Sequence, residues 1–170
     1  PHQGFTGNGV GVAVLDTGIV SHSEIPVAAF YDFLNGGKAA KPLDPFGHGT
    51  HVAGLIMDKQ GKSDARYRSV AKGVRLIGLR VLDDSGSGYT STVIQAIEFA
   101  IANKATLGID VLNLSLGHPI YEPAATDPLV QAVERAVAAG IVVVNSAGNE
   151  GTNRATGSRT SAAPASQPQS

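Results

Sequence analysis

Three polar residues with side chains suited to catalysis stand next to glycines or at the end of an apolar run. Asp16 ends an apolar run, His48 lies between two glycines, and Asn149 follows a glycine. A strand-end carboxylate beside a histidine makes an acid/base pair in which the carboxylate orients the imidazole. The amide N–H groups of an asparagine stabilise a developing oxyanion. If the fold brings these residues together, they predict a site for proton transfer and oxyanion stabilisation.

Each of these residues also has a simpler interpretation. Asp16 is a good strand-ending turn residue, Asn149 suits a turn between glycines, and a lone histidine is more often structural than catalytic. His48 and His51 have a spacing that metal ligands use on a helix, but no glutamate follows His48 as in the HExxH pattern. We expect His51 to point inward with the apolar face of its helix. The residue types alone leave these alternatives open.

The segment Asp16-Thr17-Gly18 is also the signature of aspartic proteases. That mechanism needs a second carboxylate, from a second copy of the motif or from a symmetric dimer of an all-β fold. The chain contains the motif once, and its hydrophobic pattern is not all-β. The sequence therefore argues against an aspartic protease.

Further segments that contain glycine carry weaker signals. Asp83-Asp84-Ser85-Gly86 predicts a solvated acidic turn, with calcium binding as the lesser alternative. Gly86-Ser87-Gly88 and Ser115-Leu116-Gly117 by themselves predict turns. The segment from Gly7 to Gly11 precedes a strand instead of linking a strand to a helix, so it does not fit a dinucleotide-binding loop.

Strands and helices must position these residues, and the hydrophobic pattern predicts both in alternation. Short apolar runs rich in β-branched residues are typical of strands buried on both faces; they are Val10–Leu15, Val74–Leu82, Val111–Leu116 and Ile141–Val144. Other segments have helical spacing or helix-end signals; they are Thr50–Asp58, Thr90–Lys104 and Asp127–Ala139. This order predicts an α/β fold, a three-layer, doubly wound parallel sheet whose ligands bind beyond the carboxyl ends of the strands.

The composition limits the function classes. The chain has 170 residues, 42% of them apolar and 16% charged, which is enough for one buried core. With 13 Lys and Arg against 14 Asp and Glu, no charged block predicts binding to nucleic acid or to an anionic membrane. The sequence has no cysteine, which excludes disulfides and a cysteine nucleophile. Its apolar runs are far shorter than the roughly 20 residues of a membrane-spanning helix.

Four motifs together resemble the subtilisin-like serine proteases, or subtilases, in their order and approximate spacing. They are Val14-Leu15-Asp16-Thr17-Gly18, Gly47-His48-Gly49-Thr50-His51-Val52-Ala53-Gly54, Asn113-Leu114-Ser115-Leu116-Gly117 and Ala147-Gly148-Asn149-Glu150-Gly151. The resemblance extends over residues 7–157, and the histidine motif is the most specific of the four. It implies a subtilisin-like fold and a serine-type endopeptidase that hydrolyses peptide bonds by Ser/His/Asp acyl transfer.

The resemblance also implies a role for each motif. Asp16 and His48 match the Asp and His of the catalytic triad, and Asn149 matches the oxyanion-hole asparagine. Ser115-Leu116-Gly117 looks like the segment that lines the primary specificity pocket, and Gly86-Ser87-Gly88 like the edge that pairs with an extended substrate by strand addition. The implied partner is a peptide or protein. The chemistry needs no cofactor, structural calcium is expected from the family, and the protein is expected to be secreted by a bacterium.

The family's nucleophilic serine has no matching motif in this sequence. Subtilases place it in Gly-Thr-Ser-x-Ala-x-Pro, and the nearest string here contains Ser161, lacks the leading glycine and reaches proline one residue early. The alternative to an endopeptidase is therefore a non-catalytic truncated fragment or pseudo-protease that keeps a peptide-binding groove. A third hypothesis is that another polypeptide supplies the serine.

The distribution of apolar residues predicts where the folded part ends. From Gly148 to Ser170 no Val, Ile, Leu, Met, Phe, Tyr or Trp occurs, so this stretch has little apolar surface to bury. We expect residues 1–153 to form the N-terminal portion of a subtilase catalytic domain and residues 154–170 a low-complexity, disordered tail. A sheet that stops there is expected to be incomplete on its C-terminal side and to self-associate through an uncovered core edge.

Overall fold

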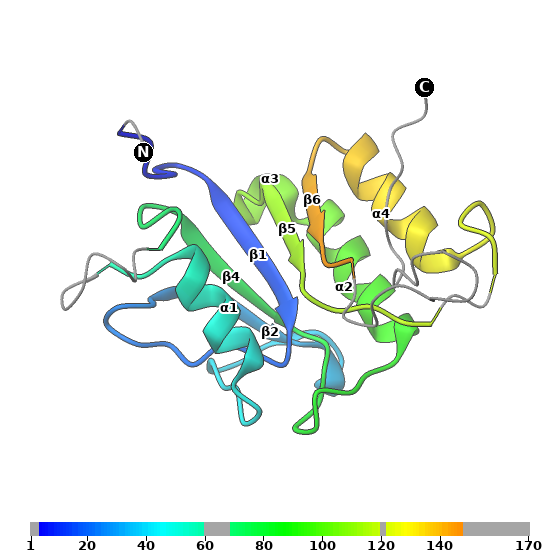
Figure 1. The fold of residues 1–170 in the computed structure, drawn as a ribbon, viewed down its shortest axis with the longest axis horizontal. Helices are drawn as coiled ribbons and strands as arrows, with labels where there is room; N and C mark the ends of the chain where they lie inside the picture. The colour runs from blue at the N-terminus through cyan, green and yellow to red at the C-terminus, as the bar shows by residue number, and fades with distance from the viewer. Residues whose placement is uncertain (1–3, 60–68, 120–121, 148–170) are drawn as a thin grey trace, which may run out of the picture.

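The strands of the described residues form one six-stranded sheet (Figure 1). Its strands lie in the order β3 (Lys38–Ala39), β2 (Val27–Asp32), β4 (Arg75–Arg80), β1 (Gly11–Asp16), β5 (Val111–Leu114) and β6 (Val142–Asn145). The computed structural model describes residues 4–59, 69–119 and 122–147. The predicted apolar runs form parallel neighbours in this sheet; they are β1 (Gly11–Asp16), β4 (Arg75–Arg80), β5 (Val111–Leu114) and β6 (Val142–Asn145). The predicted α/β class and the parallel arrangement of these four strands are therefore confirmed.

The hydrophobic pattern does not predict the remaining two strands, β2 (Val27–Asp32) and β3 (Lys38–Ala39). β2 pairs in parallel with β4, and β3 pairs antiparallel with β2 at the edge of the sheet. The run Val27–Tyr31 is apolar but has a single β-branched residue, Val27, and only Phe30 and Asp32 of β2 are buried. Phe30 packs where Gly78 of β4 has no side chain, since a Cβ atom on Gly78 would lie 2.5 Å from its ring. This contact depends on tertiary packing and leaves no periodic signal.

Helices cover both faces of the sheet. The predicted helices correspond to α1 (His48–Ile56), α2 (Thr90–Ala102) and α4 (Pro128–Ala138), and short helical segments occur at η1 (Phe33–Asn35) and α3 (Lys104–Leu107). Asp127 begins α4 as the sequence predicts, because its carboxylate accepts hydrogen bonds from the backbone N–H groups of Leu129 and Val130. In the described parts of the chain, no helix is long and apolar enough to cross a membrane.

Alternate residues of β1 show how the layers are held together. Val12 and Val14 belong to the apolar cluster that packs against α1 through Ala53. Ala13 and Leu15 belong to the larger cluster on the opposite face, which contains residues of α2 and α4. Side chains of a strand alternate between its two faces, so the uninterrupted apolar run of β1 is explained by burial on both sides. Figure 1 shows α1 on one side of the sheet and α2 and α4 on the other.

The parallel strands bring their carboxyl ends to one edge of the sheet. In the register of the sheet Asp16, the last residue of β1, lies beside Arg80, the last residue of β4. β5 ends at Leu114, so Ser115 leaves the sheet at the same edge. Ligands of such sheets bind at this edge. The fold therefore brings Asp16 and Ser115 to its carboxyl edge, with α1 beginning nearby at His48.

Candidate functional site

His48 and Asp16 form a close pair at the carboxyl edge of the sheet. His48 Nδ1 lies 2.7 Å from Asp16 Oδ1. The Asp16 side chain is fully buried, whereas the side chain of His48 is 43% exposed. Asp16 Oδ1 also accepts a hydrogen bond from the backbone N–H of Thr17 at 2.7 Å. The pair thus joins a buried carboxylate to an imidazole that solvent and ligands can reach.

The contact with Asp16 determines which nitrogen of the neutral imidazole carries the proton. A carboxylate can only accept, so Nδ1 of His48 must donate to Asp16 and Nε2 keeps its lone pair. Within the described residues, the second carboxylate oxygen of Asp16, Oδ2, is buried and accepts no hydrogen bond. A buried acceptor without a partner is destabilising. This cost argues against Asp16 being placed only to end a strand.

Asp44, which the sequence reasoning missed, holds the first turn of α1. Its Oδ1 accepts hydrogen bonds from Thr17 Oγ1 at 2.7 Å and from the Gly47 N–H at 2.9 Å. Its Oδ2 accepts from the N–H and the Oγ1 of Thr50, at 2.8 and 2.6 Å. These donors come from β1's end and from both sides of His48. The only sequence signal is an acidic residue shortly before the histidine motif.

The hydrogen bonds of Asp44 favour its charged form. Burial raises the pKa of the Asp44 carboxyl, but hydrogen bonds from Thr50, Thr17 and Gly47 together lower it, and the pKa lies below its ordinary value of 3.8. A carboxyl group whose pKa is lower in the folded state stabilises the fold at pH values above its unfolded pKa. This contribution is lost as the pH falls below about 3.8 towards the folded pKa.

Arg80 is a second buried residue that the sequence reasoning missed. Its Nε donates to the carbonyl oxygen of Thr17 at 3.1 Å, and its Nη1 lies 3.3 Å from Asp32 Oδ2. Its Nη2 donates to Asp84 in the turn that follows β4. Arg80 thus links the residue after Asp16 to the turn at Asp84. The signal for it is that it is one of two arginines within the mainly apolar run Val74–Leu82.

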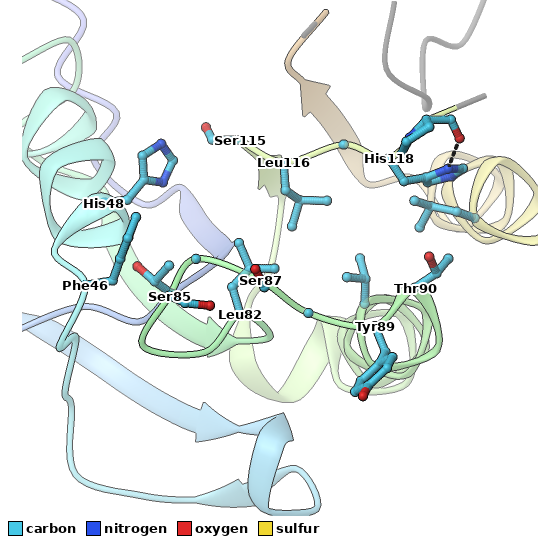
Figure 2. A pocket seen from close by; sticks show the side chains of 17 residues that line it. Phe46, His48, Leu82, Ser85, Ser87, Tyr89, Thr90, Ser115, Leu116 and His118 are labelled. Carbon is cyan, nitrogen blue, oxygen red and sulfur yellow. Dashed lines mark hydrogen bonds between the residues drawn. The ribbon is translucent and has the colours of Figure 1, made fainter. Parts of the chain in front are cut away.

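A cleft of about 480 Å³ extends from His48 along the edge of the sheet. Figure 2 shows Ser115 and Leu116 along one side, Ser85 and Ser87 along the other, and His48 at one end. The predicted substrate-binding segments Gly86-Ser87-Gly88 and Ser115-Leu116-Gly117 both line this cleft together with His48. An elongated cleft between two chain segments is suited to a peptide in extended conformation.

Asp83 organises the turn that borders this cleft. Its Oδ1 accepts hydrogen bonds from Ser85 N–H, Ser85 Oγ and Ser87 N–H, at 2.8, 2.6 and 3.0 Å. The hydrogen bond from the Ser85 hydroxyl, followed by those from the backbone of Ser87 and Ser85, lowers the pKa of the Asp83 carboxyl. Asp84 is paired with Arg80. These contacts agree with the predicted acidic turn, and the lesser alternative of calcium binding there stays a prediction.

The structure corrects the expectation for His51. His51 is exposed, whereas Gly49 and Ala53 are the buried residues of α1. Each residue turns the helix by about 100°, so His51 lies about 200° from Gly49 and faces away from the sheet. The expectation that His51 points inward is therefore wrong. Among the described residues, His48 and His51 are part of no group of three or more His, Cys, Asp or Glu side chains that could hold a metal ion.

Some predicted features lie outside the described residues. They are the oxyanion candidate Asn149, the serine Ser161 and the predicted tail at residues 154–170. Their roles stay predictions. In the ranges that the structure describes, no group of three or more His, Cys, Asp or Glu residues gathers in a way that could hold a metal ion. The expectation of structural calcium therefore rests on the resemblance alone.

Comparisons with known sequences all match this chain to subtilases. A model described as "Subtilase family" matches residues 7–170. The chain is 40% identical over 156 residues to Serine protease AprX of Bacillus subtilis (strain 168), which covers 88% of this chain and 35% of that protein. It is 41% identical over 150 residues to Subtilisin Savinase of Lederbergia lenta, covering 88% of this chain and 51% of that protein.

Solved structures give the same result for the fold. Sphericase matches with a TM-score of 0.75 and 33% identity, covering 88% of this chain and 49% of that one. A cold adapted subtilisin-like serine proteinase matches with a TM-score of 0.72 and 35% identity, covering 88% of this chain and 50% of that one. The chain thus spans about half, or less, of the length of the relatives it matches.

Proposed function

Because this chain belongs to the subtilase family, we propose that it provides the acid/base part of a serine endopeptidase active site. His48 is the base, and Asp16 orients it. The observation that carries the proposal is the 2.7 Å contact between His48 Nδ1 and the buried Asp16 carboxylate, at one end of an extended cleft. The cost of burying Asp16 Oδ2 without a partner among the described residues supports a functional role over a structural one.

The pair is suited to proton transfer from a serine hydroxyl. With Nδ1 of His48 donating to Asp16, Nε2 has the lone pair that takes the proton as the serine oxygen attacks a peptide carbonyl. The charged carboxylate of Asp16 then stabilises the imidazolium that forms. In the second half of the step, Nε2 returns this proton to the leaving amine, which leaves an acyl-enzyme. The role of Asn149 in this proposal is to donate a hydrogen bond to the oxyanion of the tetrahedral intermediate.

The substrate of the proposed endopeptidase is a peptide or protein segment in extended conformation. It would lie between Gly86-Ser87-Gly88 and Ser115-Leu116-Gly117, the two segments that border the cleft beside His48. Its backbone would pair with these segments as an added strand. By resemblance to the subtilases, the proposal includes secretion by a bacterium, structural calcium, and no cofactor in the chemistry itself.

A serine-reactive fluorophosphonate probe tests whether this chain carries its own nucleophile. The family motif is missing and Ser161 matches it poorly, so we expect no labelled serine by mass spectrometry of the chain alone. We expect an extended peptide still to bind in the cleft, as measured by fluorescence polarisation. A label on Ser161 that disappears in His48→Ala would instead show a complete triad within this chain.

The alternative function, a non-catalytic groove, makes a different prediction in the same experiment. In one outcome, the chain binds peptide while the probe labels neither the chain nor any polypeptide that co-purifies with it. That result would support the non-catalytic groove. If a co-purifying polypeptide is labelled only in the presence of this chain, the serine comes from that polypeptide. If the chain bound no extended peptide, both the proposed endopeptidase function and the alternative of a peptide-binding groove would be contradicted.

We also propose that the chain self-associates through the open edge of the sheet at β6. Val142 and Val144 on this strand are 61% and 50% exposed, and among the described strands β6 pairs only with β5. Exposed apolar edge strands pair with other chains. We expect Val144→Lys to lower the weight-average mass measured by light scattering at high protein concentration.

A matched control separates the edge from general surface hydrophobicity. The exposed fraction of Val137 on α4, 51%, is close to that of Val144, but Val137 lies on a helix and not on the sheet edge. Val137→Lys introduces the same charge and is expected to leave the mass unchanged. A wild-type chain that stays monomeric at all concentrations would contradict the proposal, as would equal effects of the two variants.

A further inference from the structure

We infer that Asp44 is a positioning residue for the acid/base pair, because its carboxylate fastens the start of α1 to the end of β1 and thereby fixes His48 against Asp16. This inference rests on the proposed function, in which the pair is catalytic. Asp44 lies in the loop before α1 and is 8% exposed. Its hydrogen-bond partners in the described part of the chain are Thr17, Gly47 and Thr50, not the imidazole, so it acts through the backbone that carries His48.

One carboxylate connects two structural elements here. From the strand side, Thr17 Oγ1 donates to Asp44 Oδ1 at 2.7 Å, and Thr17 directly follows Asp16. From the helix side, the N–H groups of Gly47 and Thr50 donate to the two oxygens of Asp44, at 2.9 and 2.8 Å. Gly47 and Thr50 stand on either side of His48 in the chain. The His48 backbone is therefore held from both directions.

Thr17 extends this connection to the residue after His48. Its hydroxyl oxygen donates to Asp44 and accepts a hydrogen bond from the Gly49 N–H at 3.0 Å. The Thr50 hydroxyl acts in a similar way, since it donates to Asp44 Oδ2 at 2.6 Å and accepts from the Val20 N–H at 2.9 Å. Both hydroxyls thus bridge α1 to the chain that follows β1. Charge-assisted hydrogen bonds of this kind are the stronger ones.

A helix cap alone does not account for this arrangement. Gly47, the residue before α1, has no side chain to cap the helix, and Asp44 takes over that task by accepting from Gly47 and Thr50. A cap needs no contact with β1, yet Asp44 also binds Thr17. Proton transfer depends strongly on distance, and a displacement of about 1 Å can cost about 100-fold in rate. The bond to Thr17 joins the start of α1 to the end of β1, beyond what a cap requires.

The test measures the His48–Asp16 hydrogen bond directly by NMR. In the wild-type chain we expect a strongly downfield ring-proton signal from His48 Nδ1–H, assigned by its loss in His48→Gln. Asp44→Asn replaces an acceptor-only group by an amide that cannot accept all four hydrogen bonds. We expect this variant to exchange the His48 Nδ1–H with water about tenfold faster, or to lose the signal.

Two further comparisons separate positioning from stability. Asp127→Asn removes a similarly buried carboxylate that caps α4, so we expect it to lower the unfolding free energy but to leave the His48 signal in place. Thr17→Val removes the hydroxyl bridge and is expected to act as Asp44→Asn does, whereas Thr17→Ser keeps the hydroxyl and is expected to restore the signal. Should Asp44→Asn fail to fold, the two Thr17 variants decide the question.

The outcomes distinguish this inference from the proposed function. A wild-type chain without the downfield His48 signal would contradict the acid/base pair itself. A wild-type signal that persists unchanged in Asp44→Asn and Thr17→Val would leave the pair intact and overturn the positioning role of Asp44. An equal loss of signal in Asp127→Asn would also overturn it, because general destabilisation would then explain the effect.

Discussion

Asp16→Asn is expected to lower kcat for the proposed peptide hydrolysis, in which His48 is the base, by about 10,000-fold. The amide N–H of an asparagine at position 16 would donate to Nδ1 of His48. Nδ1 would then hold the lone pair and Nε2 the proton, so Nε2 could not accept the proton of the serine. Asp16 is fully buried behind His48, so we expect KM to change far less than kcat. The measurement is the initial rate with a chromogenic peptide at saturating concentration.

Asp32→Asn is the matched control for this prediction. Asp32 is also buried at the end of a strand, and its carboxylate pairs with Arg80. Losing that charge leaves Arg80 with one partner fewer and is expected to destabilise the fold, with a much smaller effect on kcat. A kcat for Asp16→Asn within tenfold of the wild-type value, or an equal loss in Asp32→Asn, would show that Asp16 does not orient the base.

The parts of the fold that the sequence predicts are those with a local signal. Short apolar runs identify β1 and β4, and the Asp127-Pro128 pair marks the start of α4. The signal of β2 is weaker, because its apolar run Val27–Tyr31 has only one β-branched residue, and Phe30 packs into the space that Gly78 leaves in the assembled sheet. Its burial is therefore a product of the assembled sheet.

The same distinction applies to the site. Asp16 and His48 are identified from their motifs, and the structure brings them to 2.7 Å. Asp44 and Arg80 are missed because they act through hydrogen bonds between segments far apart in the chain, such as Arg80 to the Thr17 carbonyl and Asp44 to the Thr17 hydroxyl. The orientation of His51 is mispredicted because α1 faces the sheet with Gly49 and Ala53, two small residues that an apolar pattern underweights.

Gly49→Ala tests how closely α1 must approach β1, and we expect it to disrupt the site. A Cβ atom on Gly49 would lie 2.1 Å from the Gly18 carbonyl oxygen and 3.0 Å from Asp16 Cβ. A backbone oxygen this close cannot be accommodated unless α1 moves away from the end of β1. The shift would carry His48 away from Asp16. We expect the unfolding free energy to fall by about 1–3 kcal/mol and the downfield His48 signal to be lost.

Gly54→Ala provides the opposite expectation within the same helix. Among the described residues, a Cβ atom on Gly54 would meet only Ile25 Cδ1, at 3.4 Å, which is an ordinary contact with the end of a flexible side chain. Alanine in a helix interior is favoured over glycine by about 0.5–1 kcal/mol, so this variant should be as stable as the wild type or more stable, with the His48 signal unchanged. Chemical denaturation of both variants measures the difference. If Gly49→Ala were as stable as Gly54→Ala and kept the His48 signal, the close approach of α1 to β1 would not be what holds the pair together.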